Sequence, residues 1–209
     1  MTGRVTAGDA LARLRAGNAR FAAHVRSHDS LASAARRAEL VVAQEPCAIV
    51  LGCSDSRVPV EIVFDQGPGD LFVIRVAGNI VAPSLIGSVE FAAERFGTRL
   101  VVVLGHTSCG AIMATIEELH RPTQNQSPNL KAIVDRIRPG VAALVTNDSG
   151  GNDAALEQSA MRANILASVT QLRRGSAIIE GLIEAGKLRV VGAWYSLDTG
   201  VVQFLEETL

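Results

Sequence analysis

The chain has 209 residues, of which 48% are hydrophobic, 20% charged and 4% aromatic. A chain with this much apolar material can build a buried core, which excludes a wholly disordered protein. Its 20 Lys and Arg residues nearly cancel its 21 Asp and Glu residues, leaving a net charge of −1. We therefore expect no nucleic-acid partner, because such a partner needs a basic surface or aromatic side chains on which bases stack.

The sequence shows no membrane or secretion signal. No apolar stretch approaches the roughly 18 to 20 residues that cross a bilayer, and residues 1–20 carry several charges and no apolar block. We expect a cytoplasmic protein with no membrane partner. The three cysteines, Cys47, Cys53 and Cys109, are too few for a disulfide framework. In a reducing compartment, such cysteines are core residues, metal ligands or nucleophiles.

The N-terminal part of the sequence predicts a helical arm over residues 6–45. In residues 6–23 the apolar side chains recur at the spacing of an amphipathic helix. Residues 29–45 are rich in alanine and in charged residues, and they also predict a helix. After Pro46 the pattern changes abruptly to short apolar runs.

The rest of the chain alternates between apolar strands and helices. Four short apolar runs with β-branched residues predict strands at 47–53, 71–76, 100–105 and 188–195. Helices are expected at 83–97, 109–120, 128–147 and 155–185, the last broken near Gly175, and loops at 121–129 and 147–153. Residues 197–200 predict a tight turn that returns residues 201–204 as an antiparallel edge strand.

Near-continuous apolar strands that alternate with helices are typical of a parallel sheet covered on both faces. We therefore predict an α/β fold with a central, mainly parallel sheet flanked by helices. The sheet is expected to have about four parallel strands plus an antiparallel edge strand. The sequence shows no internal repeat, so we expect a single domain over residues 1–209.

The residues that follow the first and third predicted strands suit a metal. In open α/β sheets, ligands bind beyond the carboxyl ends of the strands, and Cys53, His106 and Cys109 all fall there. Two thiolates and an imidazole suit tetrahedral zinc with its fourth position open. Cys109 begins a predicted helix, whose N-terminus helps to hold a thiolate by lowering its pKa.

Other interpretations of these residues stay open at this point. A cysteine at the end of a strand is often a small buried core residue, and His106 suits a hydrogen-bonding turn. Cys109 and His106 can also form a nucleophile pair, although nothing upstream supplies an orienting group. Residues 105–110 resemble a phosphate loop only weakly, because no Lys-Ser/Thr pair follows them.

Asp55 and Arg57 stand close to Cys53 in the sequence. In one interpretation, Asp55 caps a helix that begins at Pro59 and Arg57 is a solvated charge. In the other, Arg57 keeps Asp55 ionised, because a neighbouring positive charge lowers the pKa of a carboxyl group. An ionised Asp55 beside zinc can accept a hydrogen bond from bound water, or occupy the fourth position itself.

Taken together, residues 53–57 (CSDSR) and 106–109 (HTSC) resemble the paired motifs of the β-class carbonic anhydrases. The pair is far more specific than either motif alone. The resemblance extends over essentially the whole chain, including residues 67–72 (GPGDLF) and 75–79 (RVAGN). It implies that Zn2+ is the cofactor, with Cys53, His106 and Cys109 as its ligands, and that Asp55 and Arg57 form a catalytic dyad.

The resemblance also implies a substrate pocket built at a subunit interface. The pocket residues carry over to Gln44, Phe72, Ala77, Phe91 and the backbone of Gly110. Members of the family form homodimers, often paired into homotetramers, whose N-terminal helices reach onto the neighbouring subunit. Residues 6–23 are expected to do the same, unless they pack on the core of their own chain.

The activity that the resemblance implies is the zinc-dependent, reversible hydration of CO2 to bicarbonate and a proton. Zinc lowers the pKa of bound water so that hydroxide is available near neutral pH, and Asp55 orients this hydroxide by accepting its proton in a hydrogen bond. Family members rest either with water as the fourth zinc ligand or with the equivalent aspartate on zinc. The second form is typical of members with tryptophan where this chain has Val50, so we favour the water-ligated form.

Some alternatives remain beside this activity. Relatives of this fold hydrolyse carbonyl sulfide or carbon disulfide with the same metal set. A non-catalytic zinc or redox module is also conceivable, but it would leave Asp55 and Arg57 without a role. His24, His28 and His120 are candidate proton carriers, although each is more simply a surface histidine. Cys47 lies among apolar neighbours and is expected in the core.

Overall fold

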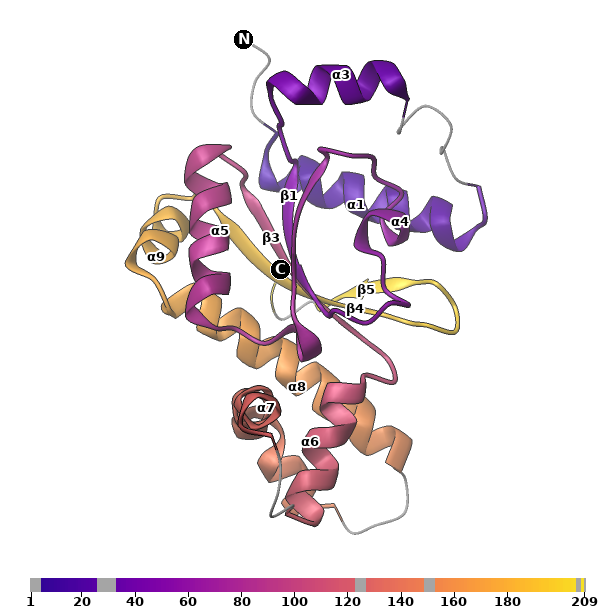
Figure 1. Ribbon diagram of the computed structural model, residues 1–209, viewed down its shortest axis with the longest axis vertical. Helices are drawn as coiled ribbons and strands as arrows, with labels where there is room; N and C mark the ends of the chain where they lie inside the picture. Colours follow the sequence, from indigo (N-terminus) through magenta and orange to yellow (C-terminus); the bar gives the residue numbers. More distant parts are fainter. Residues whose placement is uncertain (1–4, 26–32, 123–126, 149–152, 206–207, 209) are drawn as a thin grey trace.

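A computed structural model of the chain describes residues 5–25, 33–122, 127–148, 153–205 and 208. Its centre is a five-stranded sheet in the order β2-β1-β3-β4-β5 (Figure 1). The strands are β1 (Ala48–Gly52), β2 (Leu71–Arg75), β3 (Leu100–His106), β4 (Arg189–Tyr195) and β5 (Val202–Phe204). The first four are parallel, and β5 pairs antiparallel with β4. The predicted α/β fold, with its antiparallel edge strand, is confirmed.

Helices surround this sheet, in bounds close to the predicted ones. They are α1 (Ala7–Ala22), α3 (Ala34–Val42), α4 (Val60–Val63), α5 (Pro83–Arg95), α6 (Gly110–His120), α7 (Pro128–Thr146), α8 (Asp153–Arg174) and α9 (Ala177–Glu184), with a short 3-10 turn, η1 (Ala77–Asn79). The predicted break near Gly175 separates α8 from α9. No helix in the described part of the chain is long and apolar enough to span a bilayer.

Both faces of the sheet are buried, which explains the near-continuous apolar character of the strands. Alternate side chains of a strand point to opposite faces. On β1, Ala48 and Val50 join the core formed with α1 and α4. Ile49 and Leu51 join the core formed with α5, α8 and α9. The sheet is therefore held as a rigid layer between two sets of helices.

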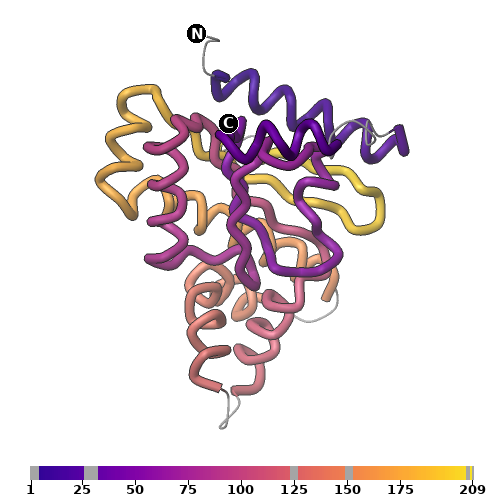
Figure 2. Tube along the Cα trace, turned by 45° about the horizontal axis from the view of Figure 1, so that its top comes forward, coloured from indigo at the N-terminus to yellow at the C-terminus, as the bar shows by residue number. Residues whose placement is uncertain are grey.

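A third, smaller core lies beyond the carboxyl ends of the strands. It includes Cys53, Cys109 and Ile112, together with Ile137 from α7 and Ala160 from α8. Helices α6 and α7 lie against each other and project from the sheet, at the end opposite to the N-terminal helices (Figures 1 and 2). Two of the three predicted zinc ligands therefore belong to a packed apolar environment.

The N-terminal helix α1 packs on the core of its own chain. Gly17 lets it approach closely, because a Cβ atom at this position would lie 1.8 Å from the carbonyl oxygen of Phe64. The buried side chain of Asn18 donates to the carbonyls of Val63 (3.1 Å) and Gly200 (2.9 Å). In this single chain, α1 therefore takes the alternative that the sequence left open, packing on its own core.

Some predicted boundaries are wrong. The helix expected over 29–45 spans only Ala34–Val42, because Ala43 is extended and Pro46 disfavours helical backbone before it; residues 29–32 lie outside the described residues. The loops expected at 121–129 and 147–153 are too long at their ends. Helix α7 begins at Pro128, which is the predicted start of that helix and a residue well suited to a first helical turn, whereas α8 begins at Asp153, ahead of its predicted start at 155.

Candidate metal centre

The three predicted zinc ligands meet at the carboxyl edge of the sheet. Cys53 directly follows β1, His106 is the last residue of β3, and Cys109 is the N-cap residue of α6. Strands β1 and β3 are neighbours, with Gly52 opposite Leu104, so the chain segments after them start side by side. The two sulfur atoms and a ring nitrogen of His106 all lie within 4.8 Å of one another. The topology thus joins two motifs that are far apart in the sequence.

The imidazole of His106 is oriented for a metal. Its Nδ1 lies 2.8 Å from the carbonyl oxygen of Thr107, which can only accept, so Nδ1 carries the hydrogen. The other nitrogen, Nε2, is buried and has no hydrogen-bond partner among the described residues. A buried polar atom left unpaired costs about 1–3 kcal/mol. A nitrogen and two sulfurs around a shared point fit zinc, which would satisfy this atom.

The two thiols differ in their acidity when no metal is bound. The pKa of Cys53 is lowered to about 4, chiefly because Cys109 donates a hydrogen bond to it, against the opposing effect of burial. The backbone N–H of Gly78 also donates to its Sγ, at 3.3 Å. The pKa of Cys109 is raised because it keeps its proton for Cys53 and is itself buried. One ligand is therefore prepared as a thiolate, and zinc binding must displace the proton of the other.

His106 is coupled to the same pair. Burial lowers its pKa, but the Cys53 thiolate and the Thr107 carbonyl raise it by more, so the net direction is upward. An imidazole that carries a proton on both nitrogens cannot bind zinc, so protonation of His106 competes with the metal. We therefore expect zinc uptake to release protons and to weaken at acidic pH.

Asp55 and Arg57 form a close ion pair beside these ligands. The carboxylate Oδ1 accepts from the backbone N–H and the Nε of Arg57, both at 2.9 Å, and Oδ2 accepts from its Nη2 at 2.7 Å. These bonds hold the pKa of Asp55 well below its usual range, against the opposing effect of burial. Its Oδ2 lies 3.9 Å from Nε2 of His106. The two side chains therefore form the ion pair on which one interpretation of the sequence depended.

The alternative in which Asp55 caps a helix is wrong. The N-cap residue of α4 is Pro59, and no side chain caps this helix. Asp55 instead binds the backbone N–H of the residue two positions on, which closes a turn within its own loop. Arg57 is not a free solvated charge either, because its Nη2 also donates to the carbonyl of Ser108 at 3.0 Å. Arg57 therefore ties the first motif to the second.

Arg75 was not assigned a role from the sequence, yet it supports the first motif directly. Its Nε donates to the carbonyl of Cys53 at 3.0 Å, and its Nη2 donates to the carbonyl of Asp55 at 2.7 Å. Arg75 is the last residue of β2, next to β1 in the sheet. A charged residue that ends a buried strand at the edge where ligands bind is the signal that could have identified it.

Sequence comparison agrees with this geometry. A family model described as carbonic anhydrase matches residues 48–202. Carbonic anhydrase from Mycolicibacterium smegmatis is 40% identical over 192 residues, which cover 91% of this chain and 89% of that protein. Carbonic anhydrase 2 from Mycobacterium tuberculosis is 38% identical over 187 residues, which cover 90% of this chain and 87% of that protein.

Comparison with solved structures indicates which class of carbonic anhydrase the chain resembles. The β-carbonic anhydrase CcaA has a TM-score of 0.73 and 26% identity, with 94% of this chain and 95% of that chain covered. The chain belongs to the β-class carbonic anhydrases. A Coccomyxa β-carbonic anhydrase solved with acetazolamide shares the fold, with a TM-score of 0.72, 23% identity, and 93% and 86% of the two chains covered. The resemblance seen in the sequence is confirmed.

The expected substrate-pocket residues of this carbonic anhydrase fall into two groups. Ala77 lies in η1 and Gly110 begins α6, so both are next to residues that contact or form the metal cluster. Phe72 is opposite Ile49 in the sheet. Ile49 lies four residues before Cys53, so Phe72 is about 13 Å from the level of Cys53 along the strand direction.

The remaining two pocket residues lie on the side of Phe72. Phe91 packs near Phe72, with ring centroids 6.2 Å apart, and Gln44 is exposed just before β1. In one chain, therefore, Gln44, Phe72 and Phe91 lie at the end of the sheet away from the metal cluster.

The other residues singled out from the sequence lie apart from the centre. His120 ends α6, about 16 Å along the helix from Cys109. His24 is exposed in the turn after α1, and His28 lies outside the described residues. Cys47 is 4% exposed and belongs to the core beneath α1, as predicted.

Proposed function

We propose that this β-class carbonic anhydrase hydrates CO2 reversibly at a zinc ion held by Cys53, His106 and Cys109. The observation that carries the proposal is the buried, unpartnered Nε2 of His106, set between two thiols and 3.9 Å from the carboxylate of Asp55. A structural zinc site has four protein ligands. Among the described residues only three cluster here, and the nearby fourth group is a carboxylate held by Arg57.

Zinc, when bound, supplies a Lewis acid that makes water a competent nucleophile near neutral pH. The chain's own residues would prepare the rest. Asp55 stays ionised beside Arg57 and accepts a hydrogen bond from the nucleophilic water, which aims a lone pair at the carbon of CO2. Arg57 holds Asp55 in that orientation by two side-chain bonds. The N-terminus of α6, where Gly110 lies, favours the negative charge that develops on the substrate oxygens.

We also propose that Asp55 stays off the metal in the resting enzyme. Both of its carboxylate oxygens are already bound by Arg57, so moving onto zinc would break at least one of these bonds. Val50, which stands where tryptophan is typical of the aspartate-ligated form, is fully buried in the strand that leads to Cys53. The water-ligated resting form is the one that these contacts support.

The pocket for CO2 is proposed to need a second copy of the chain. Gln44, Phe72 and Phe91 lie away from the metal cluster of their own chain, and Phe91 is 54% exposed. Near them, helix α3 leaves Val41 and Val42 86% and 88% exposed. Apolar side chains this exposed are typical of an interface. A homodimer would supply these residues to a neighbouring site.

The proposed assembly is a homodimer or a homotetramer; two β-carbonic anhydrases of Sordaria macrospora with this fold are tetrameric. A cytoplasmic location stays a prediction from the sequence.

Stopped-flow CO2 hydration by the zinc-loaded protein, from about pH 6.5 to 9, tests the proposal in the range where such a water can titrate. Activity already present near pH 7 would support the water-ligated form. Activity that appears only at the alkaline end would keep the CO2 reaction but place Asp55 on the metal at rest. If no activity appears at any pH, the CO2 reaction is refuted and carbonyl sulfide or carbon disulfide becomes the substrate to test.

A further inference from the structure

The short turn η1 supplies a hydrogen bond to a metal ligand. Gly78 lies in its middle, and its backbone N–H donates to Sγ of Cys53 at 3.3 Å. The turn depends on glycine, because φ is +72° there and a Cβ atom would lie 2.8 Å from Cδ1 of Ile137 and 3.0 Å from Cβ of Ala111. The position of this N–H therefore depends on the contacts that hold the turn in place.

Two buried polar side chains of α8 hold the turn. Asn164 is 2% exposed and Ser168 is 4% exposed. Nδ2 of Asn164 donates to the carbonyl of Gly78 at 2.8 Å. Oγ of Ser168 donates to the carbonyl of Asn79 at 3.1 Å. The two residues are one helical turn apart, so they face the same way and bind successive carbonyls of η1.

These side chains lie in otherwise apolar surroundings. The neighbouring core positions of α8 are occupied by Met161, Ile165 and Val169, which pack under the sheet. A buried amide or hydroxyl is costly unless it is hydrogen-bonded. The hydrogen bonds to η1 satisfy both groups and account for polar side chains at these two buried positions.

We propose that Asn164 and Ser168 are positioning residues for the metal ligand Cys53. Asn164 fixes the carbonyl of Gly78, Ser168 fixes the next carbonyl, and the N–H of Gly78 is thereby aimed at the thiolate. An N–H bond to a ligating sulfur draws charge from it and tunes the strength of the metal–sulfur bond. The inference rests on the proposed role of Cys53 as a zinc ligand, but it does not depend on which substrate reacts.

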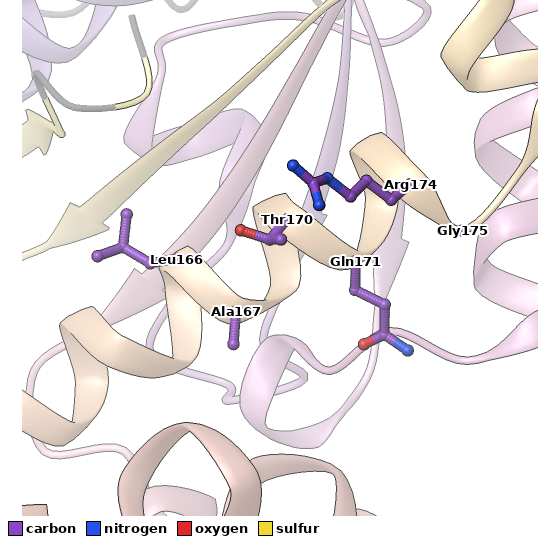
Figure 3. A pocket seen from close by; sticks show the side chains of 6 residues that line it. All are labelled: Leu166, Ala167, Thr170, Gln171, Arg174 and Gly175. Carbon is purple, nitrogen blue, oxygen red and sulfur yellow. The ribbon is translucent and has the colours of Figure 1, made fainter.

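The test uses Asn164→Leu, which removes the donor but keeps the number and branching of the side-chain heavy atoms, and Ser168→Ala, a milder change that keeps the fold accessible to measurement. The matched control is Thr170→Ala on the same helix. Thr170 is exposed and lines a shallow, mostly apolar groove along α8 (Figure 3). Thr170→Ala removes a hydroxyl group, as Ser168→Ala does, from a position two residues away that makes no hydrogen bond to η1 in the described structure.

Two readouts are independent of catalysis. In competition with a chelator, zinc affinity is expected to fall about 10-fold for Asn164→Leu, the lower end for the loss of a group that supports a ligand, and less for Ser168→Ala. In the cobalt-substituted protein, the sulfur-to-cobalt charge-transfer band is expected to move to longer wavelength. The reason is that a thiolate without its N–H bond gives up an electron more readily. Thr170→Ala should change neither.

A purely structural role predicts a different result. It would lower the melting temperatures of Asn164→Leu and Ser168→Ala. The zinc affinity and the cobalt band of the folded variants would remain those of the wild type. That outcome would overturn the positioning role while leaving the proposed function intact. If Asn164→Leu does not fold, the band and affinity of Ser168→Ala decide. A wild-type protein that binds no zinc would refute both the inference and the proposed function.

Discussion

Replacement of Asp55 by asparagine is the most direct test of the dyad. The carboxylate accepts three hydrogen bonds from Arg57, two on Oδ1 and one on Oδ2. An asparagine keeps one oxygen, but its NH2 group must then face an N–H donor of Arg57. At least one charge-assisted bond is lost, and with it the orientation of the acceptor beside His106. The ligands Cys53, His106 and Cys109 are unchanged, so the zinc content should remain that of the wild type.

The magnitude follows from the lost bond. A hydrogen bond to a charged group contributes about 1.5–3 kcal/mol. A barrier raised by that amount slows the reaction by about 10- to 100-fold, and this is the expected fall in kcat/KM for CO2 hydration. The control is Asp135→Asn, which removes another ion-paired carboxylate from the surface of α7, where Asp135 binds Lys131 at 2.6 Å. Its activity should match the wild type.

The variant Asp55→Asn also tests a prediction about the pH dependence of stability. The folded-state pKa of Asp55 lies below its ordinary value of 3.8, so the ion pair stabilises the folded protein above that pH and the stabilisation is lost as the pH falls through the lowered pKa. The contribution of the Asp55 carboxylate to the difference in unfolding free energy between wild type and Asp55→Asn should shrink as the pH falls below about 4. Full activity of Asp55→Asn with normal zinc content would refute the role of the dyad.

Three further changes test separate parts of the structure. Cys109→Ser should lose most of its zinc, measured by metal analysis, whereas Cys47→Ser, in the core beneath α1, should keep it. Arg75→Met removes both bonds to the loop that carries the first motif, so kcat/KM should fall about 10-fold through misplacement of that loop; unchanged kinetics would contradict this. Gly17→Ala should lower the unfolding free energy by about 1–3 kcal/mol through overpacking, while Gly8→Ala, whose Cβ would lie 3.8 Å from its nearest neighbour, should not destabilise.

Much of the fold follows from patterns that act over short distances. Strands such as β3 are buried on both faces, and this leaves an unmistakable apolar run in the sequence. The break before α9 was predicted near Gly175, and in the structure Ser176 then caps α9 by accepting from the backbone N–H of Ile179. The arm was harder to predict, since α3 has no buried residue that would impose a pattern.

The metal centre divides in the same way. The sequence by itself placed Cys53 and His106 at strand ends and Cys109 at a helix start, and it offered the Asp55–Arg57 pair as one of two interpretations, because these depend on residue chemistry and on short separations along the chain. Only the tertiary structure decided which groups support them. Arg75 of β2 and Gly78 of η1 bind Cys53 or its loop through directional hydrogen bonds, and Asn164 of α8 binds Gly78 in turn. Such bonds form only after the sheet and α8 have packed together, and they leave no periodic signal along the chain.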